Sequence, residues 1–356
     1  MDVVSDAISA VRIGQPSSNR LRVGGSWCTR IPGYDGAGFH VVLAGTCWLL
    51  PDGGAPVALG TGDTVLLPHG TGHVIADSPV DAATAARARP LDLDVDVDPG
   101  FDGRLPRRPE AVVGRTAPAA AETGVEVEVL CGKYRLDRSR VHPLMAELPQ
   151  VVHLPHRVGS HPELRAAIDL LGSELAGRRP GGCVAVPSLL DLLFVYMIRS
   201  WMAEAATGAW PVALGDPVVS AALRALHSDP AAPWTNERLA ADAGVSRATL
   251  ARRFTTLVGR APMAYLTWWR LTLAATQLRD TPHALAAVAR TVGYSSPYAL
   301  SHAFAREFGT TPGRYRESAR PVRPSAPPSG TRSTGQPTES LHRGPTPGPG
   351  VAGGVS

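Results

Sequence analysis

The chain has 356 residues, 44% of them hydrophobic, with four cysteines and a formal net charge of +4. This length favours two folded domains, and four cysteines in so long a chain exclude a small scaffold built on disulfides. Residues 216–318 hold 12 Arg against 7 Asp and Glu, a net charge of +5 that exceeds the charge of the whole chain. This distribution excludes a uniformly basic protein and favours a single domain that binds nucleic acid.

The N-terminal segment MDVVSDAISAVR carries Asp2 and Asp6 and lacks a basic-then-apolar run, so we expect no signal peptide. The most apolar stretch, residues 189–198, is short and includes Asp191. We therefore expect no membrane span and a cytoplasmic protein.

Residues 20–80 predict a small β-barrel or sandwich. Apolar runs such as HVVLAGTCWLL at 40–50 are separated by turns of Gly, Pro and Asp. Strand character returns at 124–136, which we expect to close the same barrel. Between them, residues 82–121 lack periodicity and predict a loop or a disordered insertion. The first domain is therefore expected to cover residues 1–135.

Two apolar helices are predicted next, at 163–177 and 186–205. Their apolar residues exceed what one domain face needs, so we expect residues 136–210 to link the domains and to form a homodimer. The tail, residues 319–356, is dominated by Pro, Ser, Gly and Thr and is expected to be disordered.

One residue skeleton occurs twice within residues 217–318. Its five members recur 50 residues later, first as Leu250, Phe254, Gly259, Pro262 and Tyr265, then as Leu300, Phe304, Gly309, Pro312 and Tyr315. Each copy follows an apolar helix and a glycine turn, in LAADAGVS and in VARTVGYS. The repeat predicts two helix-turn-helix units, the arrangement that places two helices in successive major grooves of DNA.

The helix after each turn is expected to have one buried and one exposed face. At ~100° per residue, the repeated Leu and Phe share the buried face, and the opposite face is free to contact base edges and phosphates. The exposed positions are Arg247, Ala248, Ala251 and Arg252 in the first unit and Pro297, Tyr298, Ser301 and His302 in the second. A helix over 262–278, roughly 25 Å long at ~1.5 Å per residue, is expected to hold the units about one DNA turn apart.

On these residues, and on the segment VARTVGYSSPYALSHAFAREFGTTPGRYR, the region 217–318 resembles the DNA-binding domain of AraC/XylS-family transcription regulators. The resemblance implies that the exposed positions of both helices contact bases, with promoter DNA and RNA polymerase as partners. It leaves open whether the protein is an activator or a repressor. Ala248 and Ala251 depart from the polar habit of the family, so the first helix is expected to depend on Arg252 and Arg247.

The segment GDTVLLPHGTGH at 62–73 resembles the second half of the cupin signature. Residues 5–80 and 124–205 are similar to the cupin-type sensor that precedes this DNA-binding domain in one subgroup of the family. The resemblance implies a small-molecule effector, and the candidate pocket residues are His40, Trp48 and His73. The expected architecture is therefore α+β and multidomain, with a cupin-like barrel, a helical pair and an all-α domain with two helix-turn-helix motifs.

A metal-dependent cupin would use three His and a Glu, but no ligand stands near Gly38 or within 31–34, where the signature places two of them. Two histidines do not make a stable metal site, so we expect no metal, no cofactor and no catalytic residue. The main alternative is a cupin enzyme fused to a DNA-binding module, and a third is an architectural DNA-binding protein with an inert barrel. A redox switch through Cys47 and Cys131 is a further alternative, although buried hydrophobic cysteines are the preferred interpretation.

Overall fold

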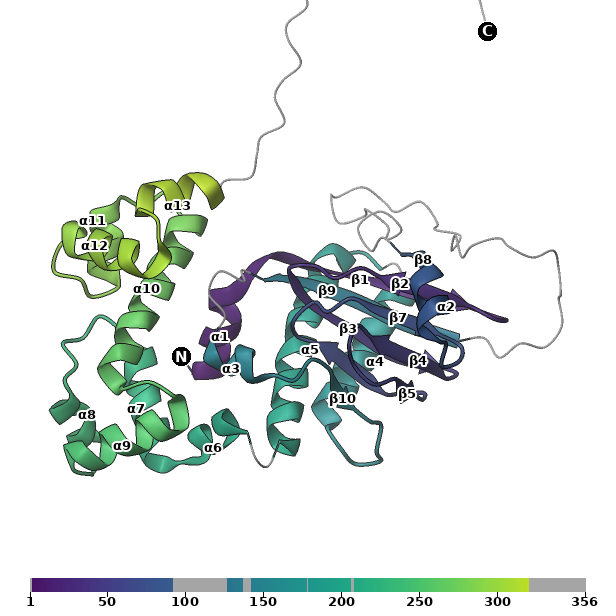
Figure 1. The fold of residues 1–356 in the computed structure, drawn as a ribbon, viewed down its shortest axis with the longest axis horizontal. Coiled ribbons are helices and arrows are strands. Elements are labelled where there is room, and N and C mark those ends of the chain that lie inside the picture. The colour runs from purple at the N-terminus through teal and green to yellow at the C-terminus, as the bar shows by residue number, and fades with distance from the viewer. Residues whose placement is uncertain (1, 92–126, 137–141, 178, 206–207, 320–356) are drawn as a thin grey trace, which may run out of the picture.

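The computed structural model describes residues 2–91, 127–136, 142–177, 179–205 and 208–319. Figure 1 shows a β-barrel with helices beside it, followed by an all-helical part. The predicted α+β multidomain architecture is confirmed. Residues 92–121 of the predicted loop and all but the first residue of the predicted tail lie outside the described residues.

Two five-stranded sheets form the barrel, with the orders β1-β9-β3-β6-β10 and β5-β4-β7-β2-β8. The strands of the first sheet are β1 (Arg12–Val23), β9 (Val127–Leu136), β3 (Gly36–Ala44), β6 (Thr64–Leu67) and β10 (Val152–Leu154). Those of the second are β5 (Val57–Leu59), β4 (Cys47–Pro51), β7 (His73–Ala76), β2 (Cys28–Ile31) and β8 (Arg89–Pro90). The predicted late strand, β9, is inserted between β1 and β3.

Strand β3 connects the inside of the barrel to the helices that cover it. Its residues alternate between two cores because successive side chains on a strand point to opposite faces. Phe39 and Val41 join the core that includes the covering helices, whereas Val42 joins the core inside the barrel. Both faces of this strand are therefore buried along most of its length.

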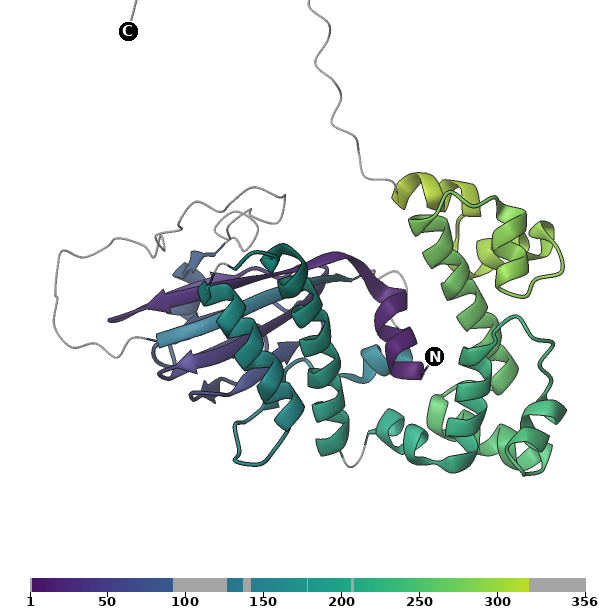
Figure 2. The same ribbon diagram turned by 180° about the vertical axis from the view of Figure 1, so that it is seen from behind.

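Helices α4 (Pro162–Gly177) and α5 (Gly182–Glu204) pack together over the first sheet (Figure 2). The buried Tyr134 of β9 donates its hydroxyl to the carbonyl of Leu190 in α5 at 2.6 Å. By length and composition alone, the 23 residues of α5 could cross a membrane. The prediction considered only residues 189–198 and therefore underestimated the length of this apolar helix. Nine residues of the helix are buried inside the protein.

Three further segments differ from the predictions. Residues 82–87, expected to be loop, form helix α2 (Ala82–Arg87), because Asp81 accepts a hydrogen bond from the amide of Thr84 at 2.7 Å and alanine favours helix. The region 136–210 contributes strand β10, which pairs with β6, in addition to helices. The chain begins with helix α1 (Val3–Val11) rather than with the barrel.

Eight helices make up the C-terminal part of the described chain. They are α6 (Ala209–Gly215), α7 (Pro217–Ser228), α8 (Asn236–Asp242), α9 (Arg247–Val258), α10 (Pro262–Asp280), α11 (Leu285–Thr291), α12 (Pro297–Phe308) and α13 (Pro312–Ala319). The predicted connecting helix at 262–278 is thus confirmed as α10, two residues longer than expected.

Helix α10 takes part in two separate cores. Tyr265, Trp268 and Trp269 belong to a core that runs continuously from the outer face of the barrel through α4, α5 and α7 to α9. Leu271 and Leu278, further along the helix, belong to a core shared with α11 and α12. The first helix-turn-helix unit is therefore packed onto the N-terminal domain, and the second is packed on α10.

A buried hydrogen-bond chain joins α1 and the start of α3 (Pro143–Glu147) to the first unit. The amide of Leu144 donates to His142 Nδ1 at 3.1 Å, so the neutral ring carries its proton on Nε2, which donates to Tyr265 Oη at 3.1 Å. Tyr265 Oη in turn donates to His227 Nε2 at 2.8 Å, and His227 Nδ1 donates to Asp6 Oδ2 at 2.8 Å. Every buried polar atom named in this chain has a partner.

The substitution Tyr265→Phe is expected to lower the free energy of unfolding of the whole chain by about 1–3 kcal/mol, because it leaves two buried imidazole nitrogens unpaired. Urea denaturation followed by circular dichroism measures this loss. Tyr298→Phe is the matched control, since its side chain is 85% exposed. Equal stability of the two variants would contradict a stabilising role for the chain.

Candidate nucleic-acid interface and sensor barrel

The recognition helix of each helix-turn-helix unit begins with a serine cap after a glycine turn. In the first, Thr235 accepts a hydrogen bond from the amide of Arg238 at 3.2 Å, and Ser246 accepts one from the amide of Thr249 at 3.1 Å. In the second, Ser296 accepts a hydrogen bond from the amide of Ala299 at 3.1 Å. Ser246 and Ser296 thus begin α9 and α12 where the turns end, whereas Thr235 begins α8 and has no counterpart at α11, whose N-cap Ala284 makes no side-chain hydrogen bond.

The turn of the second unit is packed against the first. Gly293 has a φ of 81°, and a β-carbon placed there would lie 2.7 Å from Ala231 Cα. Arg270 of α10 fixes the same loop by donating to the carbonyls of Pro230 at 2.6 Å and Ala232 at 2.8 Å. Glycine at 293 therefore permits both the left-handed turn and the close approach of the two units.

The inward residues of α9 and α12 are buried, as predicted, and the outward ones face solvent. Leu250, Phe254, Leu300 and Phe304 are completely buried. None of the eight predicted contact residues is buried. Those that are exposed are Arg247, Ala248, Arg252, Tyr298 and His302, and those that are half-exposed are Ala251, Pro297 and Ser301.

The two recognition helices lie toward opposite ends of α10 (Figure 1). Their outward faces differ in chemistry. Helix α9 presents the guanidinium groups of Arg247 and Arg252, whereas α12 presents the phenol of Tyr298, the hydroxyl of Ser301 and the imidazole of His302. The two faces are thus equipped to recognise different base edges.

Two arginines of α9 are held by carboxylates, which the sequence did not reveal. Arg247 Nη1 lies 2.8 Å from Glu237 Oε1 in an exposed pair, and Arg253 Nη1 lies 3.4 Å from Asp216 Oδ2. The hydrogen bond from Arg247 lowers the pKa of Glu237. Arg252 has no carboxylate partner among the described residues, which leaves it free to contact DNA. The only sequence signal for Arg253 was its position beside Arg252.

Inside the barrel, His40 and His73 lie in a second buried hydrogen-bond chain. The carbonyl of Thr71 can only accept, so His73 Nδ1 carries a proton and donates to it at 2.8 Å. In the neutral ring, His73 Nε2 then accepts from His40 Nε2 at 2.7 Å, and His40 Nδ1 accepts from the thiol of Cys131 at 3.1 Å. Burial lowers the pKa of His40 well below its ordinary value and that of His73 to about 4.

This donor set does not fit the metal of a catalytic cupin. Two Zn–N bonds of ~2.0 Å at a tetrahedral angle separate the nitrogens by ~3.3 Å. The two Nε2 atoms here share a hydrogen bond at 2.7 Å instead. Nor do the described residues contain a group of three or more His, Cys, Asp and Glu placed to hold a metal ion.

The two cysteines considered as a redox pair are both buried in the barrel core. Burial, followed by the charge of Asp63, raises the pKa of Cys47 to about 11. Burial also raises the pKa of Cys131. Both thiols are therefore protonated at neutral pH, and the protonated form reacts slowly with oxidants.

Trp48, the third candidate pocket residue, is separated from the two histidines. His73 pairs with Pro51 across β7 and β4, so the side chains of these two residues share one face. Trp48 lies three positions before Pro51 and points to the other face of β4, where it is half-buried. The structure thus brings His40 and His73 together and excludes Trp48 from their site.

Family models match both halves of the chain. A cupin model matches residues 2–203, which is more than half of the chain, and a model of a helix-turn-helix domain matches residues 239–318. Together with the paired recognition helices, these matches define a DNA-binding transcription regulator with an N-terminal cupin domain.

Several relatives match along nearly the whole chain. An AraC-like transcription regulator of Streptomyces lividans is 34% identical over 89% of this chain and 98% of its own length. The regulator AlkR of Acinetobacter baylyi is 29% identical over 90% of this chain and 100% of its own length. The chain belongs to the AraC-like family of transcription regulators, and both predicted resemblances are confirmed.

Among solved structures, the DNA-binding domain of AdpA in complex with a target DNA is 35% identical to this chain. The match covers 31% of this chain and 99% of that one, with a TM-score of 0.29.

Lowering the pH from 7 to 5 is expected to destabilise the fold. His40, His73 and His142 are buried and neutral, with pKa values lowered chiefly by burial. In the unfolded chain each binds a proton near its ordinary pKa of about 6.5, so protons favour unfolding below that pH. Well below pH 6 and above the folded pKa, each such histidine lowers the unfolding free energy by about 1.4 kcal/mol per pH unit.

Urea denaturation at pH 7, 6 and 5 measures this dependence. The matched variant is His142→Asn, because asparagine can still cap α3 but does not titrate. Its stability should vary less steeply with pH than that of the unsubstituted chain. If the unfolding free energy of the two proteins changed equally with pH, His142 would not contribute to the pH dependence of stability.

Proposed function

We propose that the regulator recognises a promoter sequence through the outward faces of both α9 and α12. The observation that carries this proposal is the division of each helix into a completely buried inner face and a solvent-facing outer face. Base contacts are assigned to Arg247, Ala248, Ala251 and Arg252 in α9 and to Pro297, Tyr298, Ser301 and His302 in α12. The alanines supply methyl contacts to thymine, and the arginines read guanine or hold phosphate.

The substitutions Arg252→Ala and His302→Ala are expected to weaken binding to the specific site by roughly tenfold or more, since a good base contact is worth about 1–3 kcal/mol. Binding to random DNA should change less. Fluorescence anisotropy with a fragment selected from genomic DNA, and with a random fragment of equal length, measures both affinities. Arg87→Ala, an exposed arginine of α2, is the control.

Two other outcomes have definite meanings. Equal losses on both DNAs would mean that Arg252 and His302 contact phosphate only. Binding with a steep salt dependence and no preferred site would instead support the architectural alternative.

The cupin domain is proposed to sense a small-molecule effector rather than to catalyse a reaction. The relatives that match along most of the chain are named as transcription regulators. The paired histidines in the barrel supply two nitrogen ligands, fewer than a stable metal site needs. The proposed compartment is the cytoplasm, where the promoter and RNA polymerase are the partners.

A homodimer is proposed through the outer face of α4 and α5. Seven large hydrophobic residues are exposed in the described part of the chain, and three of them, Leu170, Val184 and Leu192, lie on these two helices. Apolar side chains on one covering layer are typical of a surface that a second subunit buries.

The variant Leu192→Glu is expected to shift the chain from dimer to monomer, because dimerisation would bury an unpaired charge. Sedimentation equilibrium at micromolar concentrations measures the shift. Ser188→Glu, one turn earlier on the same exposed face, reports how widely the interface extends. A chain that is monomeric without any substitution would overturn the proposal.

A further inference from the structure

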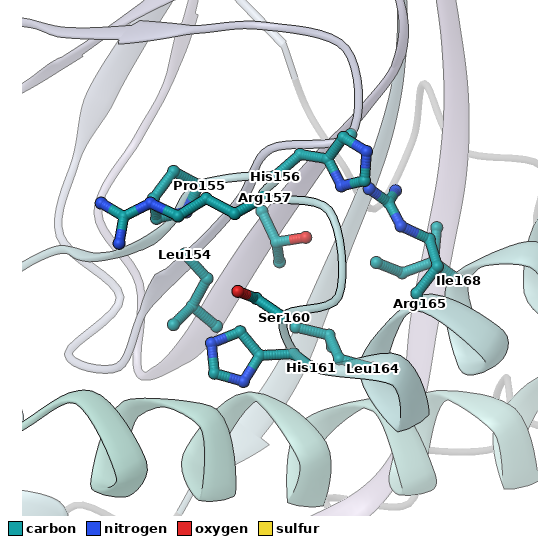
Figure 3. A pocket seen from close by; sticks show the side chains of 11 residues that line it. Leu154, Pro155, His156, Arg157, Ser160, His161, Leu164, Arg165 and Ile168 are labelled. Atoms are coloured by element: carbon teal, nitrogen blue, oxygen red, sulfur yellow. The ribbon is translucent and has the colours of Figure 1, made fainter.

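Two features of the described chain have no role in the proposed function. One is a hollow beside the start of α4, where the side chains of His156 and Arg165 lie together (Figure 3). It has room for about one water molecule, so it is too small for a ligand. The other is Arg270, a half-buried cation in the middle of α10 that lies between the two helix-turn-helix units.

Arg270 stands where the two cores of α10 meet. The residue before it, Trp269, belongs to the core of the first unit, and the residue after it, Leu271, belongs to the core of the second. These cores hold the units at their places along α10. Units with separate cores that share one helix can still rotate relative to each other if that helix bends or twists. A contact away from the helix axis would remove this freedom.

On one side, Arg270 binds the connection between α7 and α8 of the first unit. Its Nε donates to the carbonyl of Pro230 at 2.6 Å, and its Nη2 donates to the carbonyl of Ala232 at 2.8 Å. The connection has internal bonds of its own. The carboxylate of Asp229 accepts from the amide of Ala232 at 3.1 Å, and its carbonyl accepts from the indole of Trp234 at 2.7 Å. A planar guanidinium suits this task because it holds two acceptors at once in a fixed geometry.

On the other side, Arg270 lies against the turn between α11 and α12 of the second unit. A β-carbon on Gly293 would lie 3.0 Å from Arg270 Nη2 and 2.7 Å from Ala231 Cα. Burial raises the pKa of the neighbouring Tyr294 phenol, and the charge of Arg270 opposes this rise. The same guanidinium therefore lies against both units, at a point where their backbones come close together.

The surroundings of Arg270 differ from those of an arginine that binds phosphate. Arg270 is half-buried, whereas Arg252 of α9 is exposed. Two of its nitrogens already donate to carbonyls of the chain. Loss of this side chain is therefore expected to alter the arrangement of the two units more than the general attraction to DNA.

We propose that Arg270 is a positioning residue that fixes the rotation between α9 and α12 and thereby sets the spacing of the two DNA segments that they read. This role rests on the proposed function, in which both helices enter the DNA. Each base pair adds ~3.4 Å along the duplex and a rotation of roughly 34–36°. Two units held by Arg270 accept one spacing, whereas loosened units can follow a segment that is displaced by one base pair.

Binding of the full chain to DNA of altered spacing tests this role. The probe is a fragment selected from genomic DNA, on which methylation protection locates the two contacted segments. Two further fragments have one base pair inserted or removed between these segments. Fluorescence anisotropy measures the affinity for each fragment and for random DNA of equal length. The unsubstituted chain should bind the altered fragments about tenfold or more weakly than the original, because one set of base contacts is lost.

The Arg270→Met variant should lower this ratio of affinities by about threefold or more. Arg270→Lys should lower it less, because an ammonium can still donate to one of the two carbonyls. Arg224→Met, which removes an exposed arginine of α7, should leave the ratio unchanged. A partly unfolded variant binds all fragments more weakly by the same factor, so the ratio does not depend on how much of the protein is folded.

Three results would overturn the role of Arg270. They are an unsubstituted chain that binds all spacings equally, an Arg270→Met variant with an unchanged ratio, and an equal loss on every fragment including random DNA. The last result would identify Arg270 as a phosphate contact or as a support of the fold.

The variants Arg252→Ala and His302→Ala, measured on the same fragments, separate this role from the proposed function. If both weaken specific binding while Arg270→Met leaves the ratio unchanged, the proposed function stands and the role of Arg270 is wrong. If neither weakens specific binding, the reading of DNA by both helices fails, and the role of Arg270 fails with it.

Discussion

The packing of α10 against two cores sets the geometry of the DNA-binding domain. The helix has 19 residues and a length of roughly 28 Å at ~1.5 Å per residue. Tyr265 and Trp269 fix one end of it to the first unit, and Leu271 and Leu278 fix the other end to the second. Because each end is held by buried side chains, the packing of the two cores fixes the distance between α9 and α12.

The two units are attached to the rest of the chain unequally. The core of the first unit continues into α5 and the outer face of the barrel, and a buried chain from Asp6 through His227 and Tyr265 to His142 reinforces it. The second unit has its own core. A displacement of the N-terminal domain would therefore act directly on α9 and would reach α12 through α10 and through the contact between Gly293 and Ala231.

The duplicated units were predictable because their signals are local. Caps at Thr235 and Ser246, glycine turns, and a repeated Leu and Phe at four-residue spacing all operate within a few residues of each other. The outward faces followed from the same spacing. Helix α1 was missed for the opposite reason: although Asp2 caps it, its packing against α7 and α10 depends on residues more than 200 positions away.

The barrel shows the same limit of sequence reasoning. The cupin signature located His73, but the register that pairs β3 with β9 and β6 is what places His40 between Cys131 and His73. Trp48 was also predicted to line the pocket, but strand alternation directs its side chain to the other face of β4. Strand β10 was not predicted, because its three residues form a strand by pairing with β6, which is distant in the sequence.

A route of contacts leads from the edge of the barrel beside α4 to the DNA-binding domain without entering the barrel. Inside the barrel His40 and His73 are bonded to each other, and at the edge beside α4 His161 pairs with Glu204. From that edge, contacts lead to the DNA-binding domain. Glu204 ends α5, α6 packs on α9, and Asp216 both caps α7 and pairs with Arg253 of α9. A change at the start of α4 would thus reach the first recognition helix through packed helices and ion pairs without passing through the barrel interior.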